Sequence, residues 1–82
     1  MEENMLALMK RLNSSSQFLQ SNDMRVTEVR HGFAKVEMII DEQILNIHGF
    51  VHGGALFSLA DTVAGAASFA TGRDSVTLTG TI

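Results

Sequence analysis

The sequence has no cysteine, no tyrosine and no tryptophan among its 82 residues. Without cysteine, neither a disulfide nor a cysteine-based metal site can stabilise the fold. A chain of this length also buries a smaller fraction of its surface than a larger domain does. Because 45% of the residues are apolar, the stability of one small domain has to come from a hydrophobic core or from contact with a partner chain.

Basic residues are few, and they are spread along the chain. Lys and Arg together number 6 against 9 Asp and Glu, which gives a net charge of −3 with the histidines neutral. No basic stripe is present to collect phosphates, and only phenylalanine is available to stack on bases. Nucleic acid is therefore not an expected partner.

The sequence carries no pattern of a signal peptide or of a membrane span. Glu2 and Glu3 stand where a signal peptide has positive charge. The longest apolar-rich run, residues 55–70, contains Asp61 and is too short and too polar to cross a bilayer. These features predict a soluble, cytoplasmic protein that does not associate with membranes.

The first half of the chain predicts a helix followed by a β-hairpin. Residues 2–13 carry apolar side chains at helical spacing, which favours a packing helix over a membrane- or partner-binding helix. Residues 24–40 alternate between apolar and polar side chains with a period near two, which is typical of strands. His31-Gly32 provides the turn, because glycine adopts positive φ without a steric penalty.

The second half predicts a loop over residues 41–54, a helix over residues 55–70 and a final strand. The helix has an apolar stripe and many small residues, and Thr71-Gly72 ends it with a C-terminal glycine. In the final strand, Ser75 to Ile82, apolar residues alternate with threonines.

Two adjacent glycines, Gly53 and Gly54, precede the expected helix. The first N–H groups of a helix have no internal acceptors and lie at the positive end of its dipole. A ligand oxygen can approach these donors closely because no side chains stand in the way, and such donors stabilise a carbonyl that becomes an oxyanion. Taken alone, the glycine pair is explained equally well as a tight turn into the helix.

Asp61 lies further along the helix among apolar neighbours. A carboxylate there is costly to bury without a partner or a task, and beside a ligand cleft it can act as a general base or nucleophile. Asp61 and Gly53 are separated by two turns, or about 11 Å of rise. An antiparallel helix from a second subunit would bring Asp61 of one chain near Gly53 of the other. The alternative interpretation of Asp61 is a solvated helix residue.

The loop and helix together carry a motif of fixed spacing, which consists of Asn46, Gly49, His52, Gly53, Gly54 and Leu59-Ala60-Asp61. With this motif, residues 24–80 resemble the hotdog thioesterases of the phenylacetate-degradation (PaaI-like) group. The resemblance implies an α+β hotdog fold, in which an antiparallel β-sheet wraps a long central helix. It also implies a homodimer or homotetramer that hydrolyses acyl- or aryl-CoA thioesters without a metal or other cofactor.

The resemblance further implies a role for each matching residue. The N–H of Gly53 polarises the thioester carbonyl, and Asp61 of the opposite subunit attacks the carbonyl or activates water. Asn46 and His52 place the water or orient the carbonyl. The remaining substrate-binding candidates are Gly54 and, on the strand after the helix, Thr79 or Thr77.

Structural interpretations and other functions remain open at this stage. Considered singly, Asn46 and His52 are ordinary turn or capping residues, and Thr79 suits a strand by β-propensity alone. A metal site built from His48, His52 and Asp61 has a spacing that matches no usual zinc pattern. The competing functions are a non-catalytic acyl-CoA-binding hotdog protein, a hydroxyacyl-thioester dehydratase that uses His52, and an inactive truncated remnant.

The hotdog domain of the family continues with further strands beyond the position of Ile82. We therefore expect residues 1–82 to form a single, partial hotdog domain, and we favour part of a longer protein over a true truncation or a sheet completed by other copies. Without those strands, the helix over residues 55–70 is poorly covered and strand edges are open to pairing.

Overall fold

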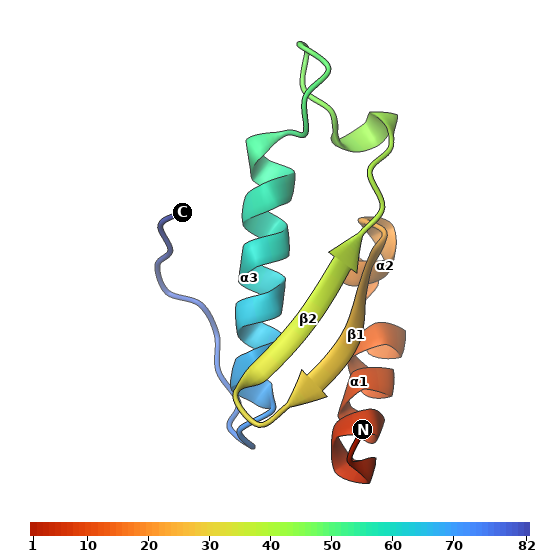
Figure 1. The fold of residues 1–82 in the computed structure, drawn as a ribbon. Coiled ribbons are helices and arrows are strands. Elements are labelled where there is room, and N and C mark those ends of the chain that lie inside the picture. The colour runs from red at the N-terminus through yellow and green to blue at the C-terminus, as the bar shows by residue number, and fades with distance from the viewer.

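A computed structural model describes all 82 residues. In chain order the elements are α1 (Glu3–Ser15), α2 (Gln17–Ser21), β1 (Met24–Arg30), β2 (Phe33–Met38), the 3₁₀ turn η1 (Glu42–Ile44) and α3 (Gly53–Phe69). The helices pack on the apolar face of the hairpin, with α3 nearer β2 and α1 with α2 along β1. The loop that joins β2 to α3 projects beyond the body of the molecule (Figure 1). The protein is therefore an α+β structure, as the sequence predicts.

Two helices, rather than one, precede the hairpin. The first, α1, covers the segment where a helix is predicted and continues to Ser15. Ser16 interrupts the helix, and its hydroxyl accepts a hydrogen bond from the Leu19 N–H at 3.3 Å. Serine is a favourable N-cap residue, so the residue that follows the end of α1 also starts α2. The sequence pattern does not predict this second, five-residue helix.

The predicted hairpin over residues 24–40 is confirmed, since β1 and β2 pair in an antiparallel ladder. Gly32 in the turn has φ +72°, a conformation that strains other residues. The ladder shifts register between Val26 and Glu28, which leaves Thr27 as an extra residue in β1.

This bulge decides which side chains of β1 are buried. In a regular strand, successive side chains point to opposite faces, so Val26 and Val29 would lie on opposite sides of the sheet. One extra residue resets the alternation. Both valines are consequently buried, at 1% and 0% exposure.

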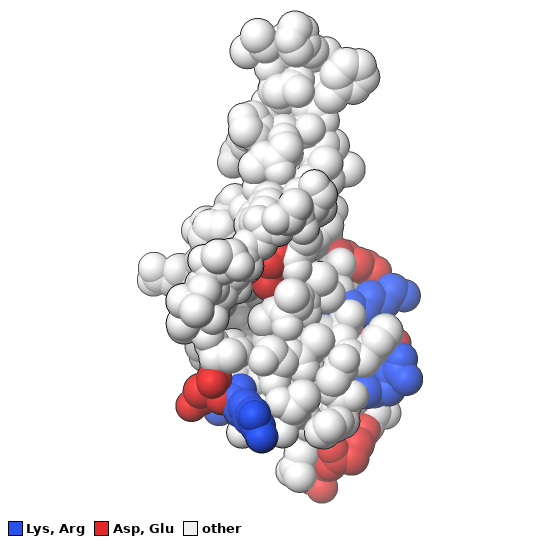
Figure 2. Space-filling view, turned by 90° about the vertical axis from the view of Figure 1, so that its left-hand side faces the viewer, with Lys and Arg blue, Asp and Glu red and all other residues white.

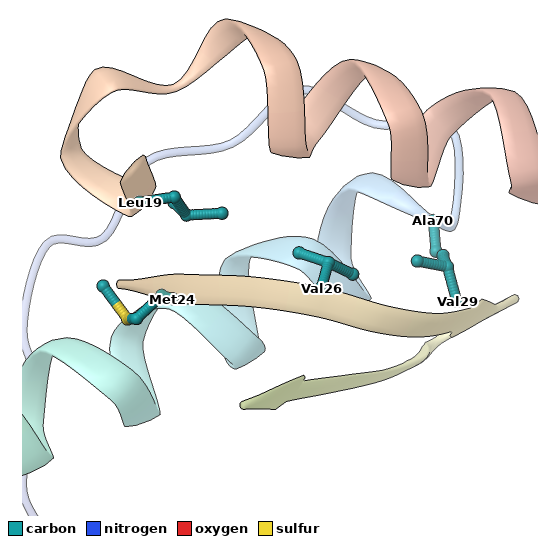
Figure 3. Packing of buried hydrophobic residues seen from close by; sticks show 5 residues of the cluster. All are labelled: Leu19, Met24, Val26, Val29 and Ala70. Atoms are coloured by element: carbon teal, nitrogen blue, oxygen red, sulfur yellow. The ribbon is translucent and has the colours of Figure 1, made fainter. Parts of the chain in front are cut away.

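The core is small and is built around these two valines. Figure 3 shows it between α1 and α2, β1 and the end of α3, with Val29 beside Ala70. Apolar side chains of α1 pack against it. The buried cluster consists of Leu19, Met24, Val26, Val29 and Ala70.

Asn13 joins α1 to the edge of β1. Its side-chain amide donates to the Val26 carbonyl at 2.9 Å, and its Oδ1 accepts from the Val26 N–H at 2.8 Å. This pair of hydrogen bonds takes the place of those that a neighbouring strand would make. The main-chain groups of Val26 are thereby satisfied, and the edge of β1 is closed at this residue.

The helix predicted over residues 55–70 is present as α3 and begins two residues earlier, at Gly53. After its last turn, Gly72 has φ +89° and donates its N–H to the Phe69 carbonyl at 2.9 Å, which is the glycine-dependent ending that the sequence predicts. None of the helices combines the length and the apolar character that crossing a lipid bilayer demands.

The final strand predicted over Ser75 to Ile82 is not formed. Residues 73–82 have no regular secondary structure and run alongside α3 (Figure 1). A strand needs hydrogen bonds to a neighbouring strand, whereas the side-chain bonds of this segment go to the helix. Val76 and Leu78 are 87% and 91% exposed, so the alternating apolar residues that suggested a strand have no partner surface.

Replacing Asn13 by alanine is expected to lower the free energy of unfolding by about 1–3 kcal/mol, because two partly buried main-chain groups of Val26 lose their partner. Urea unfolding followed by circular dichroism measures the change. Asn4, exposed on the same helix, gives the control Asn4→Ala, which should cost less than about 0.5 kcal/mol. Equal losses for the two variants would contradict the role of Asn13.

Candidate active site

Asn46 organises the loop that leads into α3. Its Oδ1 accepts hydrogen bonds from the N–H groups of His48 at 2.9 Å and Phe50 at 3.1 Å. Its own N–H donates to the Phe50 carbonyl at 2.7 Å, and its carbonyl accepts from the Gly49 N–H at 3.0 Å. Gly49 has φ +81°, which the tight turn requires. Asn46 therefore fixes the loop, and its Nδ2 donates to no protein atom.

His52 is the N-cap of α3. Its Nδ1 accepts a hydrogen bond from the Gly54 N–H at 2.8 Å, which places the ring proton on Nε2. Its carbonyl accepts from the N–H groups of Ala55 at 2.9 Å and Leu56 at 3.2 Å. A Cβ on Gly54 would lie 3.1 Å from His52 Nδ1, so glycine at this position leaves room for the imidazole cap.

Gly53 holds the one N–H group in the first turn of α3 that has no acceptor. The following three N–H groups, from Gly54 to Leu56, all bond to His52. Gly53 is exposed, and a Cβ built on it would have no atom within 4 Å. An accessible donor at the positive end of a helix dipole is suited to a carbonyl oxygen that gains negative charge.

Asp61 lies in the middle of α3 and lines a cleft of about 540 Å³ between that helix and the segment 75–82. Its Oδ1 accepts a hydrogen bond from Thr77 Oγ1 at 2.6 Å. Asp61 is exposed. Figure 2 views the molecule from the side of the segment 75–82, where a few acidic atoms lie among uncharged ones.

The sequence-predicted residues fall into two groups within one chain. His52, Gly53 and Gly54 lie at the start of α3 and Asn46 in the loop before it, whereas Asp61 and Thr79 line the cleft. Asp61 is eight positions after Gly53, which corresponds to about 12 Å along the helix axis. One thioester carbon cannot contact groups this far apart.

The threonines of the C-terminal segment and the histidine of the loop need separate comment. Sequence reasoning put Thr79 ahead of Thr77, but the structure places Thr77 on the Asp61 carboxylate. The alternation of threonines at 77, 79 and 81 signals one shared face without selecting among them. No three His, Cys, Asp or Glu side chains converge on a common point, and His48 is an exposed loop residue.

A hairpin that is followed through a loop by a long helix, with a histidine and two glycines at its first turn, defines the chain as a PaaI-like member of the hotdog class of α+β folds. More particularly, the chain belongs to the family described as "Domain of unknown function (DUF4442)", whose profile matches residues 6–79.

Three relatives support this placement. A protein named "Putative esterase" from Archaeoglobus fulgidus is 43% identical over 51 residues, which cover 62% of this chain and 33% of that protein. The acyl-coenzyme A thioesterase PaaI of Escherichia coli is 51% identical over 37 residues, which cover 45% of this chain and 26% of that enzyme. The structure of the conserved protein PA5202 from Pseudomonas aeruginosa superposes with a TM-score of 0.74 at 32% identity, and the match covers 84% of this chain and 58% of that one.

The chain thus spans a third or less of the length of the two curated relatives. By their names, the proteins to which this chain is similar include an esterase and a thioesterase. The segment they share with this chain is related to hydrolases of ester or thioester bonds.

Replacing His52 by alanine is expected to lower the stability by about 1 kcal/mol, because the Gly54 N–H loses its acceptor. His52→Asn should retain most of the stability, since asparagine is a good N-cap residue. Thermal unfolding of both variants measures this, with the exposed loop variant His48→Ala as the control. The capping role is wrong if His52→Ala and His48→Ala unfold at the same temperature.

Proposed function

We propose that the protein is an acyl-CoA thioesterase that hydrolyses acyl- or aryl-CoA thioesters to the free acid and CoA. The observation that carries the proposal is the Gly53 N–H, the single donor of the first turn of α3 without an acceptor. It stands next to a loop fixed by Asn46. The names of the two curated relatives support the same reaction class.

The proposed reaction uses water as its only co-reactant. The thioester carbonyl oxygen accepts a hydrogen bond from the Gly53 N–H. The Asp61 carboxylate takes a proton from a water molecule while the oxygen of that water bonds to the carbonyl carbon. Negative charge then collects on the carbonyl oxygen, next to the donor. When the carbonyl re-forms, the carbon–sulfur bond breaks and the sulfur of CoA receives the proton.

We further propose that two copies of the chain build each site. The separation of Gly53 and Asp61 along a straight helix, about 12 Å, prevents one chain from supplying both groups. Exposed apolar side chains near the start of α3 supply a surface for a second copy, since Ile47 is 95% exposed and Phe50 71%. A homodimer, alone or within a homotetramer, is the expected assembly, and closed pairing is the commonest arrangement of soluble oligomers.

The variant Gly53→Pro removes the proposed donor with little effect on the helix. Gly53 is the first helical residue, where proline is well tolerated, and His52 already has the extended conformation, φ −61° and ψ 135°, that a residue before proline prefers. Thiol release from a panel of acyl-CoA substrates should fall about 100- to 1,000-fold in kcat/KM.

Gly53→Ala is the matched control, because it keeps the N–H and its Cβ meets no neighbouring atom. It should retain kcat/KM within about threefold, well under the loss of a whole hydrogen bond to an oxyanion. Equal activities of the proline and alanine variants would refute the role of the Gly53 N–H. If the unaltered protein binds acyl-CoA but does not hydrolyse it, the thioesterase hypothesis is wrong and the protein is a non-catalytic acyl-CoA-binding protein.

Two inactive variants should restore activity together. Asp61→Asn lacks the base and Gly53→Pro lacks the donor, but a mixed dimer of the two has one complete site. Co-expressed chains that pair at random should recover about a quarter of the original activity, because half of the dimers are mixed and each has one intact site of two. Thiol release by the co-purified mixture measures this. A mixture as inactive as its components, despite mixed dimers shown by native mass spectrometry, would rule out the shared site.

A further inference from the structure

The carboxylate of Asp61 has one hydrogen-bond partner in the chain. Thr77 Oγ1 donates to Asp61 Oδ1 at 2.6 Å, a distance within the range of a hydroxyl bonded to a charged oxygen. The two residues come from different parts of the fold, the middle of α3 and the segment that follows it, and both line the cleft. No hydrogen bond from the protein reaches Oδ2.

We propose that Thr77 is a positioning residue for Asp61. Its hydroxyl holds Oδ1 and leaves Oδ2 as the oxygen that takes the proton from water, so this inference rests on the proposed thioesterase function. The terminal torsion of an aspartate side chain is broad, and an exposed carboxylate presents either oxygen over a range of orientations. One hydrogen bond to Oδ1 removes the equivalence of the two oxygens and narrows that range. Such orientation of a reacting group raises the rate of the chemical step.

A second pair of side chains makes it possible to distinguish orientation of the Asp61 carboxylate from attachment of the C-terminal segment to α3. Ser68 and Ser75 are joined by a hydrogen bond of 2.8 Å. Ser68 is two turns after Asp61 on the helix, and Ser75 is two residues before Thr77 on the extended segment, so both bonds lie along one face of α3. The Ser68–Ser75 bond holds the segment against the helix without touching the carboxylate. It therefore provides a control for any effect that arises only from attachment of the segment.

The test compares Thr77→Val, Thr77→Ser and Ser75→Ala in the purified protein, with steady-state thiol release from an acyl-CoA substrate. Thr77→Val keeps the shape of the side chain and removes the donor. It should lower kcat about 10- to 100-fold, the effect of losing one hydrogen bond to a charged group. Its KM should stay within about twofold, because the bond orients the base rather than binding substrate.

The other two variants test the alternative that Thr77 only attaches the segment to α3. Thr77→Ser keeps the hydroxyl and should restore kcat to within about threefold of the unaltered protein, a small part of the loss expected without the bond. Ser75→Ala should leave kcat unchanged. An unchanged kcat in Thr77→Val overturns the proposal. So does an equal loss in Thr77→Val and Ser75→Ala, since attachment of the segment alone would then explain both.

Failure of this inference is distinguishable from failure of the proposed function. If Asp61→Asn abolishes turnover while Thr77→Val does not change kcat, Asp61 is the base and Thr77 does not position it. If Asp61→Asn keeps full activity, the proposed function of Asp61 is wrong and the role of Thr77 fails with it. Circular dichroism of each variant shows that a loss of activity is not a loss of fold.

Discussion

The burial of one face of β1 is the constraint on which the other elements depend. A two-stranded hairpin is at best marginally stable by itself, and only six residues of this chain are buried. Val26 and Val29 supply the centre of that core, and α1, α2 and the end of α3 all pack against it on the same face of β1 (Figure 3). Asn13 then satisfies the main chain of Val26 from α1. The same packing holds α3 against the hairpin, and the rise of that helix fixes the separation of its first turn from Asp61.

Under the proposed function, the apolar side chains exposed near the candidate site have a role as a contact surface. A straight helix that presents a donor at its start and a carboxylate two turns later cannot bring them to one bond within a single chain. The loop before the donor carries Ile47 and Phe50, which are mostly exposed, and the face shown in Figure 2 has no charged atoms over its upper half. Exposed apolar side chains such as Ile47 and Phe50 are typical of a contact between chains, and in the proposed dimer a contact there would lie next to the Gly53 N–H.

Sequence periodicity predicted the elements whose pattern is local and missed those that depend on a neighbour. The hairpin and α3 follow from alternation, from glycine at a positive-φ turn and from the paired glycines at a helix start. The spacing of Val26 and Val29 was itself a signal of the bulge, because an odd separation of two buried residues requires an extra one between them. The run from Ser75 to Ile82 has the alternation of a strand, yet no strand lies beside it here. Its conformation depends on what it pairs with, which its own residues do not specify.

The same distinction holds within the candidate site. The motif residues were identified by their spacing and by the resemblance that it carries, whereas the choice between Thr77 and Thr79 depends on the register of the segment against α3. In the first turn of α3, the cap that stabilises the helix leaves the Gly53 N–H without an acceptor. A serine or aspartate cap would satisfy one N–H as well as His52 does, but the imidazole also keeps a proton on Nε2 for a further contact. Since His52 accepts three of the first N–H groups, the helix is held at its start while the Gly53 donor stays available to a ligand.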